Sequence, residues 1–173
     1  MIDFGFGVEL GPISDVPNLR EWRNNPDIYK WCRQFEPLNS WDHEKWFESL
    51  EHRPDVKMYS IRDGQDNVGA CGLTSLDMVN RHAEFSLYIA PALQKKGYGS
   101  AALKTLCAHG FLALGLVHIF GETFDGNPAA KMFESVGFSL EGTRRGFYYR
   151  QGEYIDAHLY SVLAGEFRTK WQL

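Results

Sequence analysis

The sequence has few cysteines and shows no paired arrangement of them. Cys32, Cys71 and Cys107 are three in number, lie far apart and form no Cys-x-x-Cys motif. Reduced, buried thiols in a cytoplasmic protein explain this pattern, and a single catalytic cysteine is the alternative. We therefore expect a cytoplasmic protein that is not held together by disulfides.

The chain also lacks an excess of positive charge and a long hydrophobic run. Its formal net charge is -4 at pH 7, whereas a protein that mainly binds nucleic acid normally carries a basic surplus. No basic residue precedes Arg20 and no apolar stretch is long enough to span a bilayer, so we expect neither a signal peptide nor a membrane segment. The six histidines show no metal-binding spacing, so no metal site is expected.

The composition is that of a globular protein. The chain has 173 residues, of which 44% are hydrophobic, and this is enough for one domain with a full core across residues 1–173. Periodicity and turn residues predict strands at 4–10, 56–62, 68–76, 84–90, 117–124, 138–149 and 153–163, and helices before Asn25 and at 40–50, 99–114 and 127–136. This order predicts an α/β fold whose mixed sheet has helices on both faces.

Two glycines and two lysines stand where a predicted strand hands over to a helix, in the segment Gln94-Lys95-Lys96-Gly97-Tyr98-Gly99. Unpaired N–H groups at a helix N-terminus favour a phosphate, and glycines allow close approach. A plain turn with two solvated lysines is the alternative. The segment lacks the GK[ST] of a mononucleotide loop and the acidic residue that follows a dinucleotide loop.

The same segment resembles the Q/R-x-x-G-x-G/A signature of the GNAT acetyltransferase superfamily. "AEFSLYIAPALQKKGYG" resembles that family's fourth strand and pyrophosphate loop, and "NPAAKMFESVGF" its later Asn-to-Gly-Phe helix. The tail "EGTRRGFYYRQGEYIDAHLYSVLAGEF" looks most like the RimJ/RimL-like branch, although many members of that branch carry an arginine where Leu10-Gly11-Pro12 stands. In the N-terminal half, "WRNNPDI" and "HEKWFESL" resemble amino-sugar acetyltransferases.

The resemblance implies a single, mostly antiparallel sheet of about seven strands that splays between the fourth and fifth strands. It implies acetyl-coenzyme A (acetyl-CoA) as donor and an amine as acceptor, and a homodimer is compatible with it. The donor's pyrophosphate would lie on the glycine loop and its pantetheine arm in the splay. The implied cofactor-binding residues are Leu87, Tyr88, Ile89, Gln94, Lys95, Lys96, Gly97, Tyr98, Gly99, Ser100, Asn127 and Phe133.

For catalysis, the resemblance implies Glu84 as the base that removes the amine proton. A structural Glu84 paired with Arg81 or His82 is the alternative. The N–H of Ile89 or a neighbour would stabilise the oxyanion. Phe133 stands where the family commonly has a tyrosine acid, so that role cannot be transferred; Ser135, Tyr148 or water remain open as substitutes.

The acceptor is the least defined part of this interpretation. Tyr29 and Trp31 lie in the region that covers the acceptor pocket in the family, and His158 is a further candidate, although core or surface roles are the alternative for all three. We expect a peptide or protein α-amine or an amino sugar rather than a lysine side chain. An α-amine has a pKa of about 7.7–8.0 and a lysine about 10.4, so more of the α-amine is neutral at pH 7 and a modest base is enough to remove its proton. A polyamine or other small amine, and a non-catalytic acyl-CoA-binding module, remain alternatives.

Overall fold

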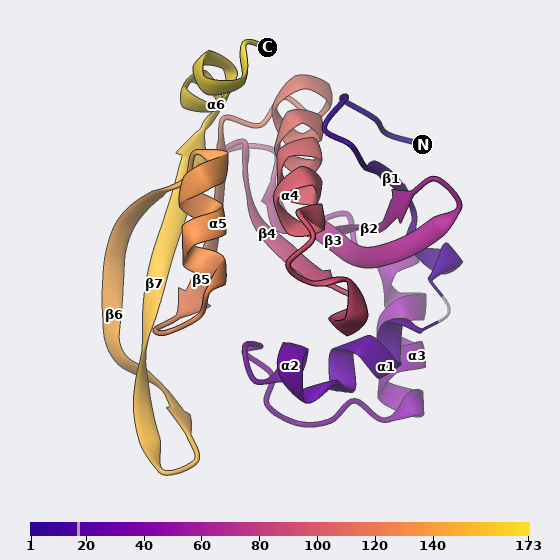
Figure 1. The fold of residues 1–173 in the computed structure, drawn as a ribbon, viewed down its shortest axis with the longest axis vertical. Helices are drawn as coiled ribbons and strands as arrows, with labels where there is room; N and C mark the ends of the chain where they lie inside the picture. Colours follow the sequence, from indigo (N-terminus) through magenta and orange to yellow (C-terminus); the bar gives the residue numbers. More distant parts are fainter. Residues whose placement is uncertain (17) are drawn as a thin grey trace.

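The computed structural model describes residues 1–16 and 18–173, and one seven-stranded sheet runs through it (Figure 1). The order across the sheet is β1-β2-β3-β4-β5-β7-β6, and only the central pair β4–β5 is parallel. The strands are β1 (Glu9–Pro12), β2 (Lys57–Asp63), β3 (Asp66–Asp77), β4 (His82–Ile89), β5 (His118–Phe124), β6 (Ser139–Arg150) and β7 (Glu153–Leu163). The predicted mixed, mostly antiparallel sheet is confirmed.

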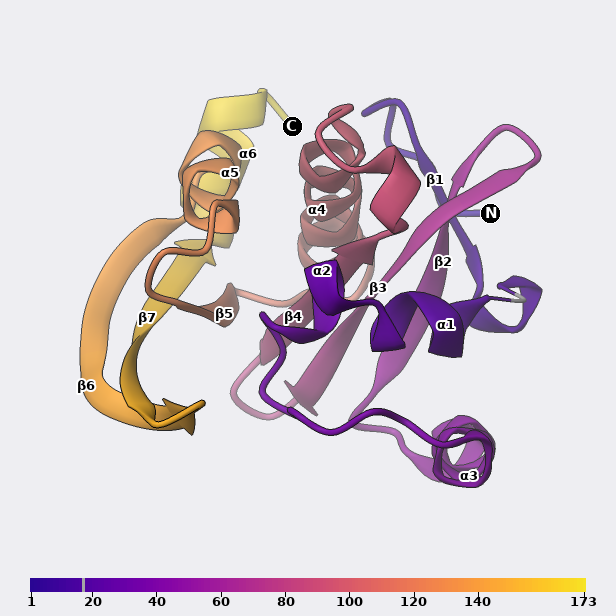
Figure 2. The same ribbon diagram turned by 60° about the horizontal axis from the view of Figure 1, so that its bottom comes forward.

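Helices cover both faces of this sheet (Figures 1 and 2). They are α1 (Leu19–Asn24), α2 (Pro26–Tyr29), α3 (Ser40–Ser49), α4 (Tyr98–Ala108), α5 (Ala129–Val136) and α6 (Ala164–Trp171). Short 3-10 turns occur at Ile13–Asp15, Leu50–His52 and Pro91–Leu93, and a π-helical turn, His109–Ala113, extends α4.

Alternation along the strands separates the two faces. The main core includes Leu73 of β3 and Phe85 of β4 together with Leu103 of α4, so these side chains point towards α4 and α5. A second cluster joins Leu19 of α1 to Ala70 of β3. Because successive strand residues face opposite sides, this second cluster marks the other face, which α1 to α3 cover.

The parallel pair β4–β5 is short. Its register joins His82 to His118 and ends where Glu84 lies opposite Phe120. β4 then continues to Ile89 while it remains paired with β3 on its other edge. The backbone of β4 beyond Glu84 therefore has no β5 partner, which is the predicted splay between the fourth and fifth strands.

Two local predictions were wrong. β1 is Glu9–Pro12 rather than residues 4–10, because Gly5 and Gly7 adopt φ values of +77° and +92°, which interrupt an extended strand. The terminal helix α6 was not predicted from the sequence. It begins directly after β7, where Glu166 accepts a hydrogen bond from the Leu163 N–H at 3.0 Å, and it buries Phe167 in the main core.

Candidate active site

The glycine loop ends at the N-terminus of α4. Gly97 is the N-cap with a left-handed φ of +92°, and no side chain caps the helix. The first helical bond runs from the Ala101 N–H to the Gly97 carbonyl at 3.1 Å. The amides of residues 98–100 therefore precede the helical ladder and face outward, as they do where a helix binds an anion.

The protein's own packing does not require glycine at position 99. A Cβ at this position would have only ordinary contacts, at 3.8 Å, with Ile89 Cγ1 and Met132 Cε. Its backbone is helical, so no positive φ requires glycine either. The free space at Gly99 fits a ligand that lies close to the backbone, and the exposed Lys95 and Lys96 add positive charge beside it.

Several side chains of the predicted cofactor loop serve to hold the loop itself. Gln94 donates from Nε2 to the Ile89 carbonyl at 3.3 Å, which ties the loop to the end of β4. The Tyr98 hydroxyl donates to Asp63 at 2.7 Å. Tyr88 packs against the second cluster on the far face, so only its backbone borders the splay, whereas Leu87 packs against the main core.

Asn127 and Phe133 lie on the α5 side of the splay. The Asn127 side chain accepts a hydrogen bond from the Ala129 N–H at 3.0 Å, at the start of α5. Phe133 is 5% exposed, and its ring packs against Phe85 with the centroids 5.0 Å apart. Phe133 therefore forms an apolar wall and offers no proton. Ser135, a candidate substitute, donates its hydroxyl to the Met132 carbonyl within α5.

A cavity of about 500 Å³ opens beside Glu84, bounded by β4, β5, β6, β7 and the segment after α2. This volume suits a small-molecule ligand. Its lining residues are Arg33, His82, Glu84, His118, Phe120, Gly121, Glu122, Glu141, Arg144, Leu159 and Tyr160. We call it the acceptor cavity.

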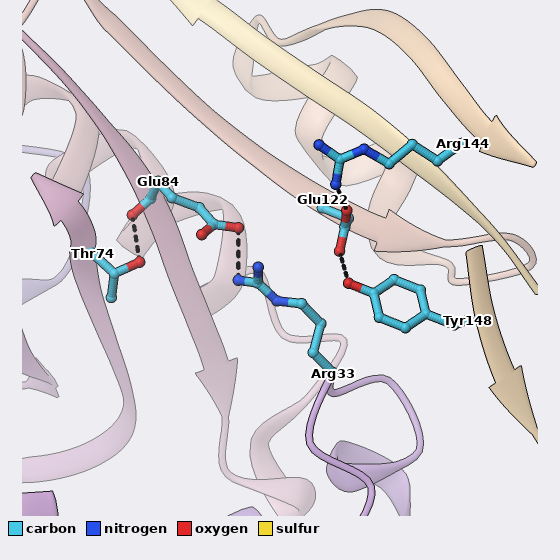
Figure 3. A network of polar contacts seen from close by, with 6 residues as sticks. All are labelled: Arg33, Thr74, Glu84, Glu122, Arg144 and Tyr148. Carbon is cyan, nitrogen blue, oxygen red and sulfur yellow. Dashed lines mark hydrogen bonds and ion pairs between the residues drawn. The ribbon is translucent and has the colours of Figure 1, made fainter. Parts of the chain in front are cut away.

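Glu84 is held by an arginine from a distant part of the chain (Figure 3). Arg33 Nη2 donates to Glu84 Oε1 at 2.7 Å, and the Glu84 side chain is only 11% exposed. The expected partners are used elsewhere: Arg81 donates to the Gly115 carbonyl, and His82 lies 3.7 Å from Asp77. The alternative that named Arg81 or His82 as the partner of Glu84 is therefore wrong in its residues, because the fold brings the segment after α2 against β4.

A second carboxylate, Glu122 of β5, lines the same cavity (Figure 3). Arg144 donates to it at 3.0 Å and the Tyr148 hydroxyl donates to its other oxygen. Burial, followed by the hydrogen bond to Glu122, raises the pKa of Tyr148 to about 12. Glu122 shares one face of β5 with Phe120 and Phe124, because every second residue of a strand points to the same side. This spacing was the signal from which its position could have been inferred.

The three predicted acceptor residues lie outside the described cavity lining. Tyr29 packs against Phe35, with ring centroids 5.1 Å apart, and Trp31 lies two residues before Arg33. His158 lies on β7 with its ring nitrogens 2.9 Å from Thr143 Oγ1 and 3.1 Å from Asp125. The region before β2 therefore contributes Arg33 to the cavity, a residue that the sequence analysis missed.

Within residues 1–16 and 18–173, no group of three or more potential ligand side chains is placed to hold a metal ion. The same part of the chain contains no helix with the length and apolar character that crossing a membrane requires.

Comparison with known proteins assigns the family. Residues 8–139 match the model of the acetyltransferase (GNAT) domain. The chain is 34% identical to the putative ribosomal N-acetyltransferase YdaF of Bacillus subtilis, over 88% of this chain and 75% of that protein. It is 31% identical to the uncharacterized N-acetyltransferase YoaA of B. subtilis, over 59% of this chain but only 58% of YoaA.

A third relative is the spermidine N(1)-acetyltransferase of Vibrio cholerae, 27% identical over 94% of both chains. The crystal structure of spermidine N-acetyltransferase from V. cholerae with CoA and spermine superposes with a TM-score of 0.84 at 24% identity, covering 92% of this chain and 96% of that one, so it supports the fold. Together with the match over residues 8–139, these similarities show that the chain belongs to the GNAT family of acetyl-CoA-dependent N-acetyltransferases.

Proposed function

We propose that the protein transfers the acetyl group of acetyl-CoA directly to a primary amine in the acceptor cavity. The observation that carries this proposal is the position of two features along β4, the strand that borders the splay. The buried carboxylate of Glu84 lies where the pairing of β4 with β5 ends, and the N-terminus of α4, which no described side chain caps, follows the far end of the same strand. Residues 1–173 would form one catalytic domain.

In this reaction the amine nitrogen attacks the thioester carbonyl, the new N–C bond forms and the C–S bond breaks. Glu84 takes the amine proton, directly or through water, and the coenzyme A thiolate takes a proton from solvent. A free thiol has a pKa of about 8.5, so the thiolate leaves without a dedicated acid. The unpaired β4 backbone near Ile89 offers an N–H to the oxyanion.

The type of acceptor has support from two directions. The similarity to YdaF supports a RimJ/RimL-like role on a peptide or protein α-amine, and the similarity to the V. cholerae enzyme supports a small amine. The resemblance of the N-terminal half to amino-sugar acetyltransferases supports a third class. All three share a primary amine, which is the common part of the proposal.

The proposal includes a cytoplasmic location and self-association. The three cysteines are free thiols, as is usual in the reducing cytoplasm. A V. cholerae spermidine N-acetyltransferase is described as dodecameric, which supports self-association of this chain, with a homodimer as its simplest form. Sedimentation velocity of the purified protein tests the second point, and a monomer at micromolar concentration would contradict it.

The test of the function is release of free thiol from acetyl-CoA in the presence of α-amines, amino sugars and polyamines. The expected result is amine-dependent thiol release with formation of an acetylated product. Calorimetry with CoA separates the alternatives. Binding without turnover on any amine supports the non-catalytic module, and absence of binding contradicts both.

A further inference from the structure

Two of the three carboxylates that line the acceptor cavity already have guanidinium partners. Glu84 pairs with Arg33 at 2.7 Å and Glu122 pairs with Arg144 at 3.0 Å. The third carboxylate, Glu141, lies 3.6 Å from His118 and accepts a hydrogen bond from Ser161. A polycationic acceptor gains most from unpaired carboxylates, so Glu84 and Glu122 offer it little.

In both ion pairs the carboxylate is the buried partner and the arginine is the exposed one. The carboxylates are the covered partners, because the side chains of Glu84 and Glu122 are 11% and 5% exposed. The guanidinium groups are the open partners, because the side chains of Arg33 and Arg144 are 55% and 48% exposed. A molecule entering the cavity therefore meets two arginines first.

Arg33 has donors to spare. A guanidinium carries five N–H donors, and the contact with Glu84 is made through Nη2 alone. Its backbone is fixed, since Arg150 Nη2 donates to the Arg33 carbonyl at 2.6 Å. Arg150 in turn lies over the rings of Phe35 and Tyr148, which anchors the segment after α2 to the β6 strand. Arg33 is thus a positioned anion-binding group beside the candidate base.

From these observations we infer that the acceptor amine carries an anionic group, a carboxylate or a phosphate, that enters the acceptor cavity together with the reacting nitrogen, and that Arg33 binds this group. The inference rests on the proposed function and specifies its substrate class. The anion takes up the N–H donors of Arg33 that Glu84 leaves free, so the guanidinium is shared between two anions and its hold on Glu84 weakens. The Glu84 carboxylate then accepts the amine proton more readily.

The test compares amines that differ only in the anion. The carboxylate arm uses the common L-amino acids against their amides; the phosphate arm uses glucosamine 6-phosphate against glucosamine, and spermidine is the polycation. Loss of the carboxylate charge makes the neighbouring amine less basic, so an amide presents more neutral nucleophile at pH 7. A preference for the acid therefore cannot arise from amine basicity.

We expect at least one anionic amine to exceed its neutral counterpart in kcat/KM by about 10- to 100-fold, the usual range for a hydrogen bond to a charged group. In Arg33→Gln this ratio should fall towards one, and Arg33→Lys should keep part of it because it keeps the charge. Arg145→Gln removes an exposed arginine outside the cavity lining and should keep the full ratio.

The outcomes separate the inference from the function. If the amides, glucosamine or spermidine are preferred, or if Arg33→Gln lowers both members of a pair equally, Arg33 has only a structural role and the inference is wrong while the acetyltransferase assignment stands. If no amine supports thiol release, the proposed function is wrong. The active arm of the panel identifies the anion as carboxylate or phosphate.

Discussion

Arg33 Nη2 lies 2.7 Å from Glu84 Oε1, although the two residues are 51 positions apart in the chain. The ion pair stands at the last position where β4 is paired with β5, so it joins the segment after α2 to the point where the sheet opens. The same Glu84 offers its carbonyl to the Thr74 hydroxyl at 3.3 Å, which fixes the strand on its other side (Figure 3). The backbone of the candidate base is therefore held on one side by Thr74, and its charge is covered by Arg33 on the other.

The first prediction concerns this carboxylate. Glu84→Gln should lower kcat by about 10²–10⁴-fold, the range for a positioned general base, while the CoA affinity stays unchanged. Glutamine keeps the shape of glutamate and can still accept from Arg33, so the fold should persist. Steady-state kinetics with an authentic acceptor and calorimetry with CoA provide the two measurements.

Glu122→Gln is the matched control, because Glu122 is equally covered and also paired with an arginine. We expect this variant to retain kcat within a few-fold. A fall of less than about threefold for Glu84→Gln at all pH values would remove Glu84 from the mechanism, since even a weak base contributes more than this.

The second prediction separates stability from cofactor binding at Gly99. Gly99→Ala should raise the stability of the ligand-free protein by about 0.5–1 kcal/mol, because a glycine within a helix is less favourable than alanine. The new Cβ has room in the free protein, at 3.8 Å from its nearest neighbours, but it fills the space assigned to the donor. CoA affinity should therefore fall by at least about tenfold, or roughly 1.4 kcal/mol.

Gly165→Ala is the control for this pair of effects. Gly165 lies in the first turn of α6, where a Cβ would meet nothing within 4 Å. It should give the same stabilisation without a change in CoA affinity. The bulkier Gly99→Val should abolish CoA binding in a folded protein; unchanged binding by calorimetry would show that the pyrophosphate lies elsewhere.

The sequence predicted the fold well because the fold depends on local patterns, and the residues expected on the donor side, which stay a prediction, were named from patterns of the same kind. The alternation along residues 84–90 and the helix signals around residues 127–137 are contained in short segments, and the glycine loop is one continuous motif. The helix start shows the limit of such signals, since α5 begins at Ala129 with Pro128 as its N-cap, one residue later than the sequence placed them. Asn127 still accepts a hydrogen bond from the Ala129 N–H.

The acceptor side could not be predicted in the same way. Its two ion pairs join residues 51 and 22 positions apart, so they depend on how the segment after α2 and the β6 strand fold over the sheet. Local pattern favoured Arg81 and His82 as partners of Glu84 because they are close in sequence. The predicted acceptor residues Tyr29 and Trp31 lie close in sequence to Arg33, but of these three residues Arg33 is the one that lines the cavity.

The third prediction concerns the pH dependence of stability. Burial and the hydrogen bond to Glu122 raise the pKa of Tyr148 to about 12, above the unfolded value of about 10. Between these values the unfolded chain has lost the proton that the folded chain retains. The stability that Tyr148 contributes through its raised pKa is therefore complete below pH 10 and is lost as the pH rises towards 12.

Tyr148→Phe should remove the part of the fall in stability between pH 10 and pH 12 that comes from this phenol. It should also lower stability at pH 7 by about 1 kcal/mol, a typical value for one hydrogen bond. Urea unfolding of both proteins from pH 7 to 11 measures the effect, and the wild-type minus variant difference in tyrosinate absorbance isolates this phenol from the others. A difference titration centred near pH 10 would contradict the buried hydrogen bond.

The last prediction tests the packing that holds the splay open. A Cβ on Gly121 of β5 would overlap the ring of Phe85 of β4, with Cζ at only 2.7 Å, so the ring occupies the wedge where the strands diverge. Gly121→Ala should therefore destabilise the protein by about 1–3 kcal/mol, as overpacking of a core does. Gly142→Ala on β6, where a Cβ meets nothing within 4 Å, should be neutral or slightly stabilising.

If the overlap is the cause, Phe85→Leu should relieve part of the penalty in the double variant, a coupling that thermal unfolding of the wild type, the two single variants and the double variant measures. Additive effects would instead mean that β5 moves away from Phe85 without strain, and the ring would then have no part in keeping the two strands apart.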